Sequence, residues 1–160
     1  MQGREKMAIS LKLIDYLKGK GWWHDEESDS YRNELISYGL NPSSDIFSFY
    51  LHAEGLPNFP TTKGELIQLA WFLLNTNYKR NSESLRAALN ISKDFLFLDS
   101  FEGGGGYLYN CKNECVYEYK VSEVKKNSNN IVMIKQWANF NIFLEFLFLQ
   151  QHPESASTLT

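Results

Sequence analysis

Length, composition and charge place the chain among ordinary globular domains. With 160 residues, of which 43% are hydrophobic and 22% charged, it is long enough to bury a core and fits a single domain. The formal net charge of -3 gives no strong positive field, so direct binding of DNA or RNA is disfavoured.

The start of the chain and its longest apolar run both argue against membrane targeting. Charged residues interrupt the apolar positions near the N-terminus, so this segment does not resemble a signal peptide. No apolar run approaches the roughly 20 residues of a membrane span, and Glu145 interrupts the longest one. We therefore expect a cytoplasmic protein without membrane association, in which Cys111 and Cys115 are reduced thiols.

Helical spacing dominates the first third of the chain. An apolar stripe followed by glycines predicts an N-terminal amphipathic helix, and the stripe consists of Ile9, Leu13, Ile14 and Leu17. An acidic loop is expected next, and then a helix from Tyr31 to Tyr38 that stops at Gly39. Ser43 or Ser44 can cap a third helix, which Gly55 can end.

The next segment carries a capping signal. Two prolines favour an extended link, after which Thr62 and Glu65 form a T-x-x-E capping box. This box predicts a helix over residues 63–75. A polar link follows, and Ser82 can then cap a short further helix.

From Asp94 onward the pattern changes to that of strands. Short aromatic and β-branched segments alternate with turn residues, which predicts strands at residues 94–99, 106–110, 115–120 and 131–135. Residues 111–114 are predicted as a tight hairpin link and residues 125–130 as a polar loop. A broad-faced, largely buried helix is expected over residues 139–150.

This order of elements predicts the fold class. Helices first, and then strands closed by a helix, are typical of an α+β domain with a mainly antiparallel sheet of about four to six strands flanked by helices. We expect one domain over residues 1–152 and a flexible tail over residues 153–160.

Four consecutive glycines at residues 103–106 raise the question of a phosphate site. A nucleotide P-loop needs Lys and Ser or Thr after its glycines and then a helix, and a dinucleotide-binding turn also opens a helix. Here the glycines precede residues 107–110, which have strand composition and contain no such lysine. The favoured interpretation is a turn between two strands in which glycine adopts a positive φ.

Cysteines and histidines form no metal or catalytic pattern. Cys111 and Cys115 could supply two ligands, but zinc needs three or four, and the three histidines lie far away in sequence. No G-x-S-x-G nucleophile motif is present. A cysteine paired with a remote histidine and a cross-strand disulfide stay open as weaker alternatives. We predict no catalytic residue, no metal and no cofactor.

An acidic cluster has two interpretations. Asp25, Glu26, Glu27 and Asp29 lie within five residues of one another. Such runs are commonly solvated loops that keep a protein soluble. Alternatively, they form an acidic patch that faces a basic partner and steers its association.

Four features follow one another between Leu40 and Gln150. They are the helix segment "NPSSDIFSFYLHAEG", a mid-chain helix, the hairpin "FLFLDSFEGGGGYLYNCKNECVYEY" and the terminal "WANFNIFLEFLF". In this order they resemble the SUKH superfamily, which includes many bacterial immunity proteins and fungal cell-wall regulators. Residues 1–40 match poorly. The residues that match are Phe97, Gly104, Gly105, Tyr107, Tyr109, Val116, Tyr117, Trp137, Phe140, Phe143 and Leu144.

The resemblance implies a non-enzymatic immunity protein that binds and neutralises a cognate bacterial toxin, such as a nuclease. The alternative is a regulatory or scaffold domain of the same fold without a toxin partner. A small hydrolase that uses Cys111 or Cys115 is a third, weaker class. We predict that the partner contacts the acidic loop, the adjacent tryptophans and the glycine turn. These residues are Trp22, Trp23, Asp25, Glu26, Glu27, Asp29 and Glu102.

Overall fold

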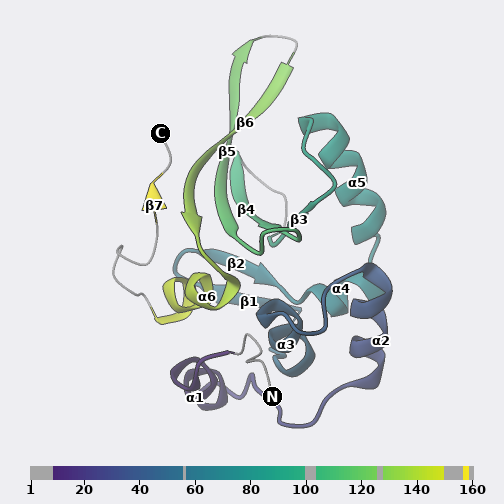
Figure 1. Cartoon of the computed structure of the whole chain (residues 1–160), viewed down its shortest axis with the longest axis vertical. Coiled ribbons are helices and arrows are strands. Elements are labelled where there is room, and N and C mark those ends of the chain that lie inside the picture. Colours follow the sequence, from purple (N-terminus) through teal and green to yellow (C-terminus); the bar gives the residue numbers. More distant parts are fainter. Residues whose placement is uncertain (1–8, 56, 100–103, 126–127, 150–156, 159–160) are drawn as a thin grey trace.

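A computed structural model describes residues 9–55, 57–99, 104–125, 128–149 and 157–158. Over these residues the chain forms six helices and two antiparallel sheets, so the predicted α+β class is confirmed. In Figure 1 the larger sheet stands above, with one helix (α5) beside it. The remaining helices and the small sheet lie below.

Three helices begin the fold, and local capping explains their limits. They are α1 (Leu11–Gly19), α2 (Asp29–Tyr38) and α3 (Asp45–His52). The side chains of Ser28 and Ser44 accept hydrogen bonds from the first turns of α2 and α3. The predicted helix at 31–38 therefore starts earlier, at Asp29, and ends at Gly39 with a φ of 109° as expected.

α3 ends before the predicted stop at Gly55. Its chain leaves the helix at Ala53 because that residue forms an isolated antiparallel bridge with Trp23. A long-range contact thus determines the end of the helix, and the glycine does not.

The capping box at Thr62 and Glu65 was the wrong prediction in this region. These residues belong to a hairpin made of β1 (Asn58–Thr61) and β2 (Gly64–Ile67), in which Thr61 pairs with Gly64. Gly64 has a φ of 123°, which a helix excludes. The helix α4 (Leu69–Asn75) follows, and the side chain of Gln68 caps it.

α5 (Tyr78–Leu89) also starts before its predicted cap. Ser82 lies inside the helix, fully buried, and its hydroxyl donates to the Lys79 carbonyl at 3.1 Å. Burial of Tyr78, whose hydroxyl donates to the Phe97 carbonyl at 2.7 Å, holds the first turn against the sheet. Tertiary packing therefore extends the helix into the predicted polar link.

The larger sheet runs β3-β4-β5-β6-β7, with every neighbouring pair antiparallel. Its strands are β3 (Phe95–Phe97), β4 (Gly105–Asn110), β5 (Val116–Lys125), β6 (Ser128–Trp137) and β7 (Ser157–Thr158). β5 and β6 extend into the segment 125–130 that was predicted as a loop. Within the predicted tail, β7 pairs with Lys135 and Gln136.

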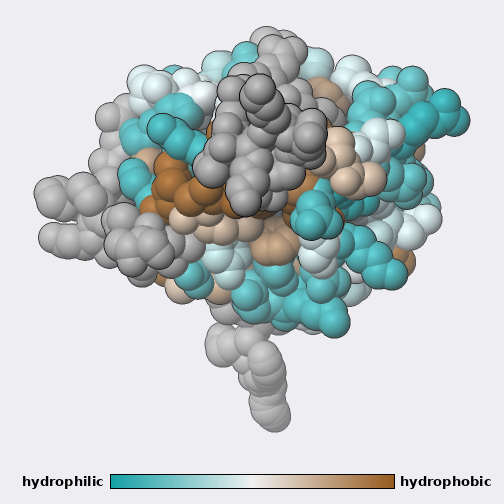
Figure 2. Space-filling model, turned by 90° about the horizontal axis from the view of Figure 1, so that it is seen from above, coloured by the Kyte–Doolittle hydropathy of each residue, from teal (hydrophilic) through white to brown (hydrophobic). Residues whose placement is uncertain are grey.

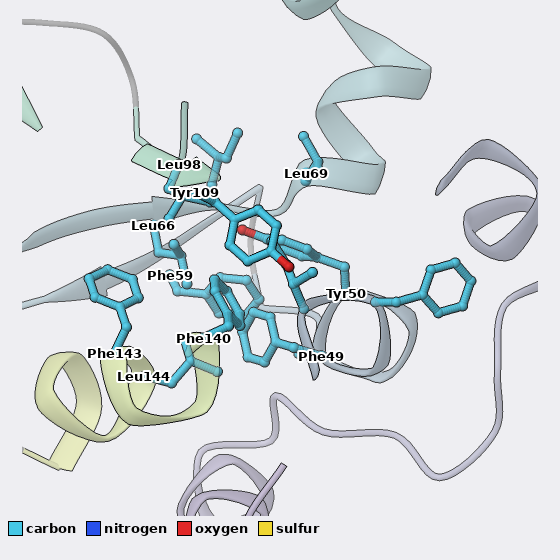
Figure 3. Close-up of a cluster of buried hydrophobic side chains, with 14 of the residues drawn as sticks. Phe49, Tyr50, Phe59, Leu66, Leu69, Leu98, Tyr109, Phe140, Phe143 and Leu144 are labelled. Carbon is cyan, nitrogen blue, oxygen red and sulfur yellow. The ribbon is translucent and has the colours of Figure 1, made fainter. Parts of the chain in front are cut away.

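α6 (Phe140–Leu149) closes the main core, as predicted. Phe49 of α3 lies at the centre, with its ring centroid 5.4 Å from Phe59 and 5.6 Å from Phe140. Figure 3 shows these rings together with Tyr50 and Tyr109, drawn from helices and strands that are far apart in sequence. The core thus joins α3, the β1–β2 hairpin, the larger sheet and α6 in one cluster.

A second, smaller cluster lies on the other face of the sheet. Phe97, Leu108 and Tyr119 are buried there, and Leu85 of α5 packs against them. Figure 2 looks onto the end of the molecule where the β5–β6 hairpin projects, and shows hydrophobic residues near the centre of a mainly hydrophilic face. The larger sheet therefore packs against the main core on one face and against α5 on the other.

The glycines do not form the predicted positive-φ turn within the part that the structure describes. Gly104 precedes β4, and Gly105 and Gly106 belong to it, all without positive φ. At Gly105 and Gly106 the absence of a side chain permits close approach of neighbouring atoms. An added Cβ would lie 2.3 Å from the Tyr119 carbonyl oxygen at Gly105, and 2.1 Å from an Asp99 carboxylate oxygen at Gly106.

Candidate protein-interaction surface

The segment before α2 that contains Asp25, Glu26 and Glu27, which we call the acidic loop (residues 22–28), contacts the C-terminal end of α3. The His24 amide donates to the His52 carbonyl at 2.9 Å, and the Glu54 amide donates to the Trp22 carbonyl at 2.7 Å. With the Trp23–Ala53 bridge between them, these bonds form a short antiparallel ladder. The ladder brings the predicted loop beside residues 52–54, which sequence analysis did not connect with it.

This docking creates two adjoining hollows, which we call the α2–α3 surface. The first, of about 350 Å³, is lined by His24, Glu26, Glu27, Ser28, Tyr31, Leu51, His52, Ala53 and Glu54. The second is lined by Glu27, Arg32, Pro42, Ser43, Phe47, Ser48, Leu51 and His52. The two hollows adjoin each other, because both are lined by Glu27, Leu51 and His52.

Glu27 is the most heavily engaged acidic group of this surface. Its carboxylate pairs with Arg32 of α2 and lies 3.7 Å from Nε2 of His52. The Arg32 guanidinium also lies 5.7 Å from the ring centroid of Phe47. Glu27 therefore links α2, α3 and the acidic loop.

A second polar contact joins two residues that line the first hollow. The Tyr31 hydroxyl donates to Oε2 of Glu54 at 2.5 Å. Burial and this neighbouring carboxylate raise the pKa of Tyr31 well above its ordinary value, so the hydroxyl stays a donor at neutral pH. The negative charge of Glu54 is thus held in place at the edge of the hollow.

The other predicted acidic residues differ in their engagement. Asp25 lies 3.5 Å from Nζ of Lys18, whereas Glu26 and Asp29 make no ion pair with any residue that the structure describes. Glu26 lines the first hollow, and Asp29 begins α2 without lining either one. Glu102 lies outside the described residues.

The two tryptophans face in different directions. Trp23 stacks on the His52 ring, with the centroids 5.0 Å apart and the planes 16° apart. Trp22 instead packs edge-on against Phe59 at 5.6 Å and against Phe148 at 6.2 Å. Both tryptophans pack against the core, but Trp22 contacts core rings, whereas Trp23 is stacked on His52, which lines both hollows.

This difference gives a test for Trp22. Replacing it with leucine keeps an apolar side chain but removes the ring contacts, and we expect a loss of about 1–2 kcal/mol in the free energy of unfolding. Denaturant titration of the purified variant measures the loss. A stability equal to that of the wild type, together with weakened partner binding, would instead assign Trp22 to the contact surface.

The polar residues of the surface that sequence analysis missed include His52, Glu54 and Tyr31. His52 and Glu54 reach it through the ladder between residues 22–24 and 52–54, whose pairing has no local sequence signal, and Tyr31 reaches it from α2. A weak signal was present in "LHAEG", since polar residues directly after an apolar helix often remain at the surface.

The cysteines lie at the β4–β5 turn, and neither lines the α2–α3 surface. Both are free thiols. Desolvation, together with the nearby Asp94 and Glu114 carboxylates, raises the pKa of Cys111 to about 11. A nucleophilic cysteine requires the opposite change, because the thiolate is the reactive form.

Comparisons with known proteins identified no relative of the chain. No family model, no curated protein and no solved structure matches the chain. Among the described helices, none has the length and apolar character needed to cross a bilayer. Within the same residues, no group of three or more His, Cys, Asp or Glu side chains is arranged to hold a metal ion.

Proposed function

We propose that the chain is a non-enzymatic immunity protein that binds a cognate bacterial toxin, such as a nuclease, through the α2–α3 surface. One observation carries this proposal: the Glu26 and Glu54 carboxylates border a hollow beside the stacked Trp23 and His52 rings. Glu26 has no ion-pair partner among the described residues. Its charge is therefore available to an incoming cation.

Charge and shape complementarity explain how such a surface acts. The catalytic clefts of nucleases are basic because they bind phosphates, and an acidic surface is attracted to them over a distance. Aromatic side chains at the centre of a contact supply burial area, while the surrounding charges set specificity and association rate. The chain would then neutralise the toxin by covering its cleft, without any chemical step.

Two further classes compete with this proposal. A regulatory or scaffold domain would use the same surface for a partner that is not toxic. A hydrolase would need a reactive cysteine, which the raised pKa of Cys111 disfavours. The gene next to that of the protein distinguishes immunity from regulation, because immunity genes lie beside their toxins.

The first test asks whether a toxin partner exists. The protein is co-purified with the product of the neighbouring gene, and its expression is then tested for rescue of cells that produce that product. We expect a stable complex and restored growth. A neighbouring product that neither binds nor harms cells excludes the immunity function.

A second test asks whether the α2–α3 surface makes the contact. Glu26→Lys should slow association about tenfold at low salt and reduce rescue, because it reverses an unneutralised charge at the hollow. Glu83→Lys is the matched control, since Glu83 is an exposed acidic residue on α5 and its replacement changes the net charge equally. Equal association rates for the two variants would place the contact elsewhere.

A further inference from the structure

His52 holds the acidic loop with its side chain as well as with its backbone. Nδ1 lies 2.8 Å from the carbonyl oxygen of His24. A carbonyl oxygen can only accept a hydrogen bond, so Nδ1 carries a hydrogen whether the ring is neutral or charged. The second proton of the imidazole is therefore gained and lost at Nε2.

Nε2 faces the most engaged carboxylate of the surface. It lies 3.7 Å from Oε2 of Glu27, and the His52 side chain is 17% exposed. In the neutral ring Nε2 presents a lone pair to this carboxylate, which repels it. After protonation the same nitrogen carries positive charge, and an ion pair with Glu27 joins the loop to α3.

The charged and titratable groups around His52 come from three segments. The acidic loop contributes His24, Glu26 and Glu27, α2 contributes Tyr31 and Arg32, and the residues after α3 contribute Glu54. Arg32 already pairs with Glu27, so protonated His52 adds a second cation to one carboxylate. The surface as a whole then becomes one charge less negative.

We infer that His52 is a proton-operated latch of the α2–α3 surface. When the ring is charged, a hydrogen bond to His24 and an ion pair to Glu27 both hold the loop. When the ring is neutral, the hydrogen bond alone remains, and the surface is more negative. Histidine is the side chain whose charge changes in the physiological pH range, so mild acidification closes the latch. The consequence for partner binding rests on the proposed function.

The latch is tested first without a partner. His52→Asn places an amide donor near the position of Nδ1 but cannot titrate. We measure hydrogen-exchange protection factors of the His24 and Glu54 amides by NMR at pH 5.5 and pH 7.5. The wild type should be protected severalfold more at the lower pH, and His52→Asn equally at both. The latch is refuted if the wild type shows no difference or if the variant keeps it.

The second histidine of the hollow supplies the control. His24→Asn removes a titrating ring from the same surface but leaves its backbone bonds with His52, so it should keep the wild-type pH response. A second measure needs no variant: in the wild type, the amide shifts of residues 22–24 should follow the titration curve of the His52 ring. Shifts that follow the His24 ring instead contradict the latch.

Binding is measured separately, with a nona-arginine peptide as the basic probe. We expect binding to be roughly threefold weaker at pH 5.5 than at pH 7.5 in the wild type, and this ratio should be smaller in His52→Asn, which keeps the His24 ring in the same hollow. Normal amide behaviour without peptide binding leaves the latch intact and counts against a basic partner. Peptide binding with the same pH ratio in both proteins overturns the regulatory effect.

Discussion

Gly105→Ala is expected to lower the free energy of unfolding by about 1–3 kcal/mol. The added Cβ would lie 2.3 Å from the carbonyl oxygen of Tyr119, which is a backbone atom of the neighbouring strand β5. β5 cannot move away without disturbing its pairing with β6, where the register already shifts between Glu118 and Tyr119. The movement of a side chain therefore cannot relieve this strain, because the obstructing atoms belong to the backbone.

Two neighbouring glycines make this prediction specific. At Gly104 an added Cβ meets no atom within 4 Å, so Gly104→Ala should stay within about 0.5 kcal/mol of the wild type. Gly106→Ala should fall between the two, because the obstacle is the Asp99 side chain. Denaturant unfolding of the three variants gives the order. Equal stability of Gly104→Ala and Gly105→Ala would contradict the role of close approach.

The second large effect concerns Asp45, the first residue of α3. Its carboxyl group is fully buried, Oδ2 accepts from the Asn141 amide at 3.0 Å, and Oδ1 has no hydrogen-bond partner among the described residues. Burial raises the pKa of Asp45 from 3.8 to about 6, with a smaller contribution from Glu114. At about 1.4 kcal/mol per pH unit, this rise corresponds to about 3 kcal/mol.

The sign follows from which state binds the proton more tightly. Between pH 3.8 and about 6 the folded protein keeps the proton on Asp45 and the unfolded chain releases it. The stabilisation is therefore complete below the lower value and is lost as the pH rises through the higher one. Asp45→Asn cannot titrate, so its stability relative to the wild type should improve by roughly 3 kcal/mol between pH 3.5 and pH 7.

Thermal or denaturant unfolding at several pH values measures this difference. Asp29→Asn is the matched control, because Asp29 also begins a helix after a capping serine but is exposed. Parallel pH profiles for the wild type and Asp45→Asn would show that the buried carboxyl does not contribute as described.

Capping residues predicted the limits of a helix correctly where the cap interacts only with neighbouring residues of the chain. Ser44 caps α3 and Gly39 ends α2, as the sequence indicates. The same chemistry failed at Thr62 and Glu65, because a T-x-x-E pattern fits a helix start and a polar hairpin equally well. The outcome depends on Gly64 and on the pairing of Phe59 with Leu66, which buries both side chains.

Only one of the two segments that form the candidate surface could be predicted from the sequence. Four clustered acidic residues are visible in the sequence. The segment at residues 52–54 that pairs with the acidic loop is remote, since His52 lies 28 positions after His24, to which it is hydrogen-bonded. The direction in which Trp22 or Trp23 points also depends on that pairing, since adjacent residues of a ladder face opposite sides. Sequence therefore indicated the charge of the surface without its geometry.

Gln68 joins the end of α3 to the start of α4. Its side-chain nitrogen donates to the carbonyls of Tyr50 at 3.0 Å and Ala53 at 2.7 Å, while its oxygen caps α4. Glutamate at this position would lose both donors, and methionine would lose the acceptor as well. The C-terminal end of α3, which contributes to the α2–α3 surface, is thus fixed by contacts within the chain. In a complex formed there, the entropic cost of becoming ordered would fall on the partner rather than on this chain.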